Sequence, residues 1–368
     1  MESSHANDFV LSDNTYLLSH SVGRPLKSAK KSFEEDFFAP WTESGKEPWM
    51  NWLNIIDAFT FGLSRLFNSE QSQFCPQVNL SSALTKLLMS LSKLPEKPTV
   101  LISEEDFPSM GFVFQKVLGA NAKIKYIPKE LDVSDVNTWQ QYISEEIDIV
   151  FISHAYSNLG KISPIKAIVE LARKNGCLSI IDIAQSAGVV ELDLTDVNPD
   201  FMIGSSVKWL CGGPGAGYLW INKAQLSQCK PNDVGWFSHK NPFEFDIHNF
   251  EYNDTALRFW GGTPSVAPYA IAAHSINYFA DLGSSKIRKY NQYLIDLLIN
   301  QLGDVVVSPI EEAKRSGTVI LNFGNNQIDA MEKLKQNCFS VDERAYGIRI
   351  SPHIYNTHED IMKLVNLF

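Results

Sequence analysis

The sequence lacks several features that would place it in a specialised class of protein. No apolar run approaches the roughly 18 residues that a membrane-spanning helix needs. The N-terminal residues show neither the basic nor the apolar region of a secretory signal. The five cysteines are scattered and have no CxxC spacing. These absences predict a cytoplasmic protein with reduced thiols and no membrane partner.

Positive charge is also scarce. Lysine and arginine number 32 against 42 acidic residues, which gives a net charge of -10. A nucleic-acid partner requires a basic face, so the charge balance argues against one. The eight histidines show no HExxH or other ligand spacing, and we therefore predict no metal site. With 368 residues, 44% of them hydrophobic, the chain is long and apolar enough for a large globular core.

From about residue 98, short apolar runs alternate with amphipathic segments. Examples are the strand-like TVLIS and IDIVFIS and the helix-like stretch 136–146. Strands that alternate with helices predict a mostly parallel α/β sheet covered on both faces. After about residue 262 two long helical patterns and short strands indicate a smaller α+β domain. We therefore predict an N-terminal arm (1–40), a large domain (41–262) and a small C-terminal domain (263–368).

Two residues at predicted strand ends could carry chemistry together. Asp182 ends the buried run in IIDIAQSAG, and Lys208 follows the run MIGSSV 26 residues later. In open α/β sheets, ligands bind beyond the carboxyl ends of the strands. Pyridoxal phosphate needs both groups, because a lysine holds it as a Schiff base and a carboxylate pairs with its ring nitrogen. Taken singly, a surface lysine and a capping aspartate are the alternative interpretations.

The glycine-rich stretch after Lys208, GGPGAG, is not a nucleotide-binding P-loop. It has no GK[ST] ending, and a strand rather than a helix follows it. The stretch is interpreted either as a turn that lets the backbone pass close to a cofactor or as a purely structural turn.

The motifs DIAQSAG and SSVKWLCGGPGAGYLW resemble the class V, fold-type I pyridoxal-phosphate enzymes, and among them kynureninase most of all. Four further stretches resemble kynureninase in order and spacing: NLSSALTKLLMSL, GWFSH, RFWGGTPSV and GIRISPHIYNTHEDI. The resemblance implies a large domain built on a mostly parallel, seven-stranded-type sheet and a smaller α+β domain. It also implies a homodimer with active sites between the subunits and a small amino acid as the substrate.

The resemblance assigns roles residue by residue. Lys208 is the implied catalytic residue, which binds the cofactor and later moves protons. Thr263 is implied to come from a partner subunit. The implied cofactor-binding residues are Ser81, Ser82, Phe107, Asp182, Gln185, Ser205, Lys208, Trp236 and Thr263, and the implied substrate-binding residues are Arg349 and Ser21. For Phe107 a core aromatic residue, for the serines a plain N-cap and for Arg349 an ordinary ion pair remain the alternatives.

Three departures from the kynureninase pattern bear on the reaction. Gln185 stands in place of a histidine, Val207 in place of a tyrosine, and Met110 in place of a second acid near the ring. The matched motifs imply kynureninase-like hydrolysis of the Cβ–Cγ bond of kynurenine or a related amino acid, and the three departures leave a class V aminotransferase or carbon–sulfur lyase acting on another small amino acid as the alternative. A third possibility, a binding protein without catalysis, conflicts with the joint retention of Lys208, Asp182 and Arg349. His20 and His239 lie in matched loops and receive no role from the sequence.

Overall fold

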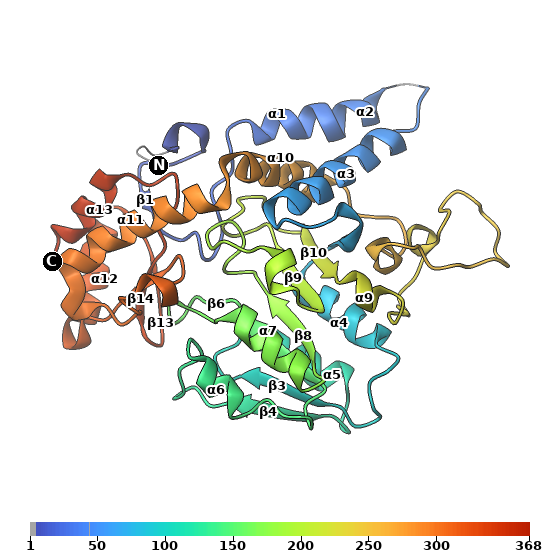
Figure 1. Cartoon of the computed structure of the whole chain (residues 1–368). Coiled ribbons are helices and arrows are strands. Elements are labelled where there is room, and N and C mark those ends of the chain that lie inside the picture. The colour runs from blue at the N-terminus through green and yellow to red at the C-terminus, as the bar shows by residue number, and fades with distance from the viewer. Residues whose placement is uncertain (1–4, 44) are drawn as a thin grey trace.

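The computed structural model describes residues 5–43 and 45–368 of the chain. A seven-stranded sheet forms its centre (Figure 1). In spatial order its strands are β2 (Phe74–Gln77), β10 (Gly217–Ile221), β9 (Phe201–Ser205), β8 (Leu178–Asp182), β5 (Ile149–Ser153), β3 (Thr99–Ser103) and β4 (Lys123–Ile127). Within this sheet β10 runs in the direction opposite to the other six strands. The predicted mostly parallel sheet is confirmed.

Both faces of this sheet are buried, because neighbouring residues of one strand point into different cores. In β5, Ile149 and Phe151 belong to one hydrophobic cluster, whereas Val150 and Ile152 belong to another. The first cluster also contains residues of α4 (Leu80–Ser90) and α5 (Pro108–Val117). The second contains residues of α3 (Trp49–Leu66), α7 (Ile165–Lys174) and α10 (Ala267–Leu282). Helices therefore cover the sheet on both sides.

The amphipathic pattern explains why α7 lies where it does. Ile165, Ile168, Val169 and Ala172 are buried and recur at helical spacing. Gly176 follows the helix with φ +75°, a left-handed conformation that favours glycine. By contrast, the helix predicted over 136–146 is short. The observed α6 (Val136–Gln140) ends in a turn, in which the N–H groups of Tyr142 and Ile143 both donate to the carbonyl of Trp139.

The C-terminal part of the chain surrounds a three-stranded antiparallel sheet. Its strands are β11 (Val319–Leu321), β14 (Gly347–Ile350) and β13 (Asp342–Arg344), and its helices are α11 (Ser284–Leu302), α12 (Gln327–Gln336) and α13 (His358–Val365). Figure 1 shows this part at one end of the molecule, in orange and red. A capping box of Thr357 and Asp360 begins α13.

The N-terminal residues lie against this C-terminal part. β1 (Thr15–Tyr16) pairs in parallel with β12 (Phe339–Ser340), and Leu18 forms a further bridge with Ser351. The following helical segment comprises α1 (Ala29–Phe33), a π-helical turn (Glu34–Phe38) and α2 (Ala39–Thr42), and α1 packs on α10. α10 in turn packs extensively on α3, although the sequence assigns α10 to the small domain. The exact domain division stays a prediction.

Short elements complete the fold. They are a hairpin of β6 (Ala155–Tyr156) and β7 (Lys161–Ile162), the helical turns α8 (Leu194–Val197) and α9 (Lys223–Leu226), and several single 3₁₀ turns. Within the described residues, no helix combines the length and the hydropathy that crossing a bilayer requires.

Candidate active site

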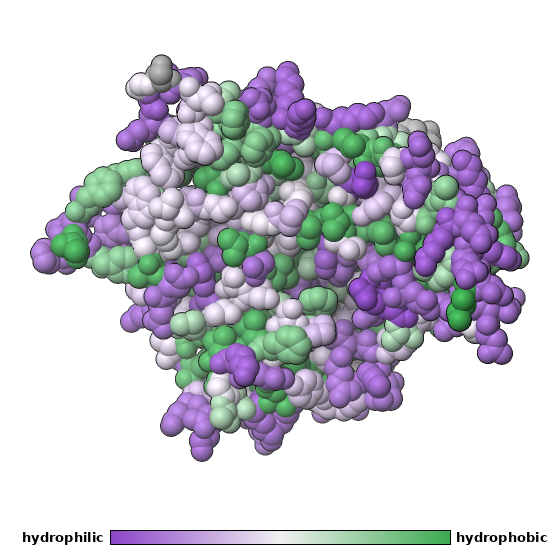
Figure 2. Space-filling view, turned by 180° about the vertical axis from the view of Figure 1, so that it is seen from behind, coloured by the Kyte–Doolittle hydropathy of each residue, from purple (hydrophilic) through white to green (hydrophobic). Residues whose placement is uncertain are grey.

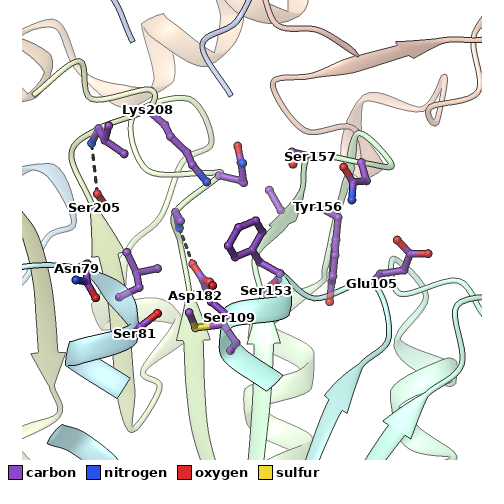
Figure 3. A pocket seen from close by; sticks show the side chains of 18 residues that line it. Asn79, Ser81, Glu105, Ser109, Ser153, Tyr156, Ser157, Asp182, Ser205 and Lys208 are labelled. Atoms are coloured by element: carbon purple, nitrogen blue, oxygen red, sulfur yellow. Dashed lines mark hydrogen bonds between the residues drawn. The ribbon is translucent and has the colours of Figure 1, made fainter. Parts of the chain in front are cut away.

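A cavity of about 270 Å³ opens where the parallel strands β5, β8 and β9 end. Its walls come from the ends of these strands, from the start of α4 and from the segment between β3 and α5 (Figure 3). Crevices beyond the carboxyl ends of parallel strands are the usual ligand sites of open α/β sheets. The cavity therefore lies where the sequence predicts the site.

Lys208 lies three residues beyond the end of β9, and its side chain reaches into the cavity. Its Nζ lies 5.9 Å from the centre of the Phe107 ring. The pKa of Lys208 is lowered to about 8, mainly by burial; Asp182 opposes this shift and Arg349 adds to it. About a tenth of the amine is therefore unprotonated at pH 7, far more than for an ordinary lysine, and this is the form that attacks a carbonyl.

The turn that carries Lys208 is held by the N-terminal arm. The backbone N–H of Gly23 donates to the carbonyl of Val207 at 2.9 Å. A Cβ atom at Gly23 would lie 2.1 Å from the carbonyl oxygen of Lys208. Only glycine allows the two segments to approach this closely. The position of the reactive amine thus depends on a residue 185 positions earlier in the chain.

Asp182 ends β8 and is buried. Burial raises the pKa of its carboxyl, while the Ala184 N–H, which donates to it at 2.8 Å, and the charge of Lys208 lower it. A buried carboxylate is costly unless a cation pairs with it. A protonated pyridine nitrogen would supply that cation, so the residue fits the predicted cofactor ring.

The other end of the cavity suits a phosphate. Asn79 caps α4 by accepting the N–H of Ser82 at 2.8 Å, and Ser81 lies in the cavity wall beside it. The first N–H groups of a helix have no partner within the helix and attract anions. Ser205 faces the same region from the end of β9 (Figure 3). Ser82, by contrast, does not line the cavity, and its N–H is already paired with Asn79.

Phe107 and Gln185 both line the cavity, as expected. Phe107 is 66% exposed, so it is not the core aromatic residue of the alternative interpretation. Gln185 is anchored because its amide donates to the carbonyl of His20 at 3.1 Å and accepts from the indole of Trp209 at 3.4 Å. An exposed ring on the cavity wall is suited to stacking on a planar cofactor.

Arg349 lies on β14, beside the cavity rather than in its wall, and is 6% exposed. Its Nη1 donates to the hydroxyl of Ser157, which does line the cavity, at 3.2 Å. Its Nε and Nη2 both donate to the carboxylate of Asp342, the first at 2.9 Å. The guanidinium thus reaches the edge of the cavity and also forms an ion pair. Its surroundings are compatible with substrate binding and with the ordinary ion pair of the alternative interpretation.

Three predicted residues lie away from this cavity. Ser21 is exposed in a turn closed by its N–H to the carbonyl of Leu18. Trp236 packs against Phe237 and Phe245 in a separate aromatic group, and Thr263 is exposed. Within one chain, these side chains therefore do not complete the cofactor pocket. The assignment of Thr263 to the site of a partner subunit stays a prediction.

The sequence reasoning missed a second buried acid. Asp106 precedes Phe107, accepts the hydroxyl of Ser153 at 2.6 Å and accepts the N–H of Ser103 at 2.8 Å. Burial raises its pKa to about 7, and the charge of Asp182 adds to the shift. Ser153 is the register partner of Asp182 across β5 and β8. The signal was available, because Asp106 follows the strand TVLIS as Asp182 ends its own strand.

The two histidines without a role have different surroundings. His20 is buried and contacts Asp342, the partner of Arg349, at 2.9 Å. His239 contacts Glu244 at 2.8 Å in the loop after the GWFSH motif and does not line the cavity. Only His20 is therefore linked to the residues around the cavity.

Known proteins resemble this chain over most of its length. The model of the family described as Aminotransferase class-V matches residues 79–364. An uncharacterized aminotransferase, YcbU of Bacillus subtilis (strain 168), is 24% identical over 321 residues, which are 86% of this chain and 84% of that protein. A kynureninase of Bacillus cereus (strain ATCC 14579) is 26% identical over 384 residues, which are 96% of this chain and 87% of the kynureninase.

A solved structure of the cystine C–S lyase C-DES, in complex with its product cysteine persulfide, has a similar fold. The TM-score is 0.86 at 17% sequence identity, and the match covers 97% of each chain. At this identity the similarity concerns the fold. It confirms the fold predicted from the sequence motifs.

Proposed function

Since the chain belongs to the class V aminotransferase family, whose enzymes use pyridoxal phosphate, we propose that it hydrolyses the Cβ–Cγ bond of kynurenine or a related β-acyl amino acid. The observation that carries the proposal is the Lys208 amine, which reaches into a cavity that also contains Asp182 and a helix N-terminus. The choice of reaction is supported by the kynureninase match, which covers 96% of the chain. The stretches GWFSH and RFWGGTPSV, which resemble kynureninase motifs, support the same choice.

The residues around the cavity have complementary roles in this proposal. When bound, pyridoxal phosphate supplies an electron sink for the charge that bond cleavage leaves on the substrate. Asp182 holds the proton on the ring nitrogen, and the start of α4 with Ser81 and Ser205 binds the phosphate. Arg349 binds the substrate carboxylate. Lys208 binds the aldehyde carbon of the cofactor and later moves protons at the substrate carbons.

The overall reaction balances with one water. The Cβ–Cγ bond breaks, the hydroxyl of water bonds to the acyl carbon Cγ, and a proton is delivered to Cβ. The products are an aromatic acid and alanine. Val207 lines the cavity without an acidic or basic group. Lys208, with its lowered pKa, is therefore assigned the proton transfers for which kynureninases carry a tyrosine before the lysine.

A class V aminotransferase or carbon–sulfur lyase is the second candidate. It is favoured by Gln185, which matches the cysteine desulfurase branch at this position. Desulfurase chemistry of that type needs a cysteine that reaches the substrate. Cys338 is exposed directly before β12 and does not line the cavity, which disfavours a persulfide on this residue.

The test is a titration of the cofactor-loaded protein with L-kynurenine, in which the visible absorption of the cofactor and the fluorescence of anthranilate are followed together. The hydrolase predicts both a changed band and anthranilate release, and Lys208→Ala provides the matched control without release. A band that responds to other amino acids, with no anthranilate formed from kynurenine, would favour the second candidate. Sulfide release from cysteine, measured also in Cys338→Ala, would then separate a lyase from an aminotransferase.

We also propose that the protein is a cytoplasmic homodimer. The long segment 235–253 projects from the molecule in Figure 1, in yellow. It carries exposed apolar residues, among them Phe245 (77% exposed) and Ile247 (93% exposed). In Figure 2, seen from behind, hydrophobic residues lie among hydrophilic ones along the same projection. An exposed apolar segment of this kind favours an intersubunit contact.

A further inference from the structure

Arg349 is surrounded by a hydrogen-bonded network that the proposed reaction does not explain. Asp342 lies directly opposite Arg349 in the antiparallel pairing of β13 with β14. It accepts from Nε and Nη2 of the guanidinium, and Ser157 accepts from Nη1. A guanidinium has five N–H donors, so these contacts leave two for a substrate carboxylate. The ion pair therefore orients the Arg349 guanidinium and still leaves N–H donors available for a substrate carboxylate.

His20 extends this network on the far side of Asp342. Its Nε2 lies 2.9 Å from the Asp342 carboxylate and its Nδ1 lies 2.6 Å from the hydroxyl of Ser351. Because a carboxylate only accepts, Nε2 carries the hydrogen. The hydroxyl of Ser351 also lies 2.8 Å from that of Thr318, and either of the two can donate.

This arrangement satisfies the imidazole in both protonation states. In neutral His20, Nδ1 accepts the hydrogen of the Ser351 hydroxyl. In protonated His20, Nδ1 donates to the Ser351 oxygen, and the Ser351 hydroxyl turns to donate to Thr318. A buried group that gains a proton usually loses a hydrogen bond or leaves a donor unpaired. Here the Ser351 hydroxyl keeps its contacts with both His20 and Thr318 in either protonation state, and the hydroxyl hydrogens of Ser351 and Thr318 turn together.

The charge of the network changes when a substrate arrives. Arg349 and Asp342 cancel each other, so a bound carboxylate adds one uncompensated negative charge in a buried region. Burial lowers the pKa of His20. Among the charged groups that act on it, Asp342 raises the pKa, and Arg349 and Lys208 lower it. A further anion beside Arg349 shifts this balance towards the imidazolium.

We propose that His20, Asp342 and Arg349 form a proton-coupled carboxylate subsite, in which binding of the substrate carboxylate at Arg349 brings one proton onto His20. The inference rests on the carboxylate-binding role of Arg349 in the proposed function. His20 and Asp342 are positioning and charge-balancing residues that act through Arg349. Carboxylate affinity then rises as the pH falls through the range in which His20 titrates.

The test follows the titration of His20 directly. Protein labelled at the Cε1 atoms of its histidines is titrated by NMR between about pH 5 and 8, and the His20→Gln variant identifies the signal. The titration is repeated with saturating propionate, which has a carboxylate and no amine, and with propionamide, its uncharged counterpart. We expect propionate to raise the His20 midpoint by on the order of one pH unit and propionamide to leave it unchanged.

Two variants identify the origin of the shift. In Arg349→Met propionate should lose its effect, because its binding group is gone. In Asp342→Asn the midpoint of His20 should start lower, because the carboxylate that raises its pKa is gone, and propionate should still raise it because the added charge is the same. The central comparison of propionate with propionamide uses the unchanged protein and does not require a variant to fold.

The inference is overturned if propionate does not bind, if it binds without moving the His20 midpoint, or if propionamide moves the midpoint equally. The visible cofactor band of the same sample tests the proposed function separately. A sample with this band and no His20 response keeps the proposed function and discards the proton coupling. A His20 response in a protein that forms no cofactor band keeps the proton coupling and discards the proposed function.

Discussion

The contact between the N-terminal arm and the turn that carries Lys208 gives a sharp prediction for Gly23→Ala. The new methyl group would lie 2.1 Å from the Lys208 carbonyl oxygen and 2.6 Å from Sγ of Cys211, where 3.4 Å marks the start of ordinary contact. The first gap is short by about 1.3 Å, and its obstacle is backbone rather than a flexible side chain. The arm or the lysine turn must therefore move.

This displacement should lower both the folding stability and the catalytic rate. Overpacking of a filled site typically costs about 1–3 kcal/mol of folding free energy, and a misplacement of about 1 Å at a catalytic group can lower the rate about a hundredfold. We expect Gly23→Ala to melt a few degrees lower and to lose most of its activity. Cofactor attachment should weaken by about tenfold or more.

The assay combines thermal unfolding, the visible cofactor band and steady-state kinetics on the same preparations. Gly303→Ala is the matched control, because a methyl group there meets no atom within 4 Å. The control should behave like the unchanged protein. If Gly23→Ala retains normal cofactor attachment and activity, the arm does not position Lys208 and the reasoning fails.

Three further predictions concern titration and assembly. The rate of cofactor attachment to the cofactor-free protein should rise with pH and level off above about 8, since the pKa of Lys208 is lowered to about 8 and its neutral amine reacts; a rise that continues to pH 10 contradicts this. Because burial raises the pKa of Asp106 to about 7, wild-type stability should fall as the pH rises from about 4 to 7. Asp106→Asn should remove this loss, which is at most about 4 kcal/mol in urea unfolding; an unchanged pH profile refutes it. The double variant Phe245→Ser and Ile247→Ser should weaken the proposed dimer in sedimentation, and an unaltered dimer places the interface elsewhere.

The sheet was predictable because its strands carry strong local signals. Continuous apolar runs such as IDIVFIS are typical of strands buried on both faces, and β5 is buried throughout. The segment 136–146 shows the limit of this reasoning. Its helical periodicity continues past Gln140, yet turn hydrogen bonds end the helix there. Local pattern predicts the existence of an element better than its boundaries.

Within the site, the residues on strand ends and helix starts were the predictable ones. Lys208, Asp182, Ser81 and Ser205 line the cavity because the ends of parallel strands meet at one edge of the sheet. Ser82 does not line the cavity, and its N–H donates to the side chain of Asn79, the N-cap of α4, so its cofactor contact stays a prediction. Trp236 and Thr263 could not be placed from one chain, since the resemblance itself assigns Thr263 to another subunit.

The surroundings of Arg349 were partly encoded in the sequence and were overlooked. The segment DERAYGIR has a turn at residues 345 and 346, and a hairpin closed there sets Arg344 opposite Gly347 and Asp342 opposite Arg349. Opposite charges directly across an antiparallel pair attract, so the ion pair follows from register alone. His20 does not follow from any such local rule, because it comes from a segment 322 residues away from Asp342. Long-range contacts of this kind depend on how the N-terminal arm lies along β14, and only the folded structure reveals them.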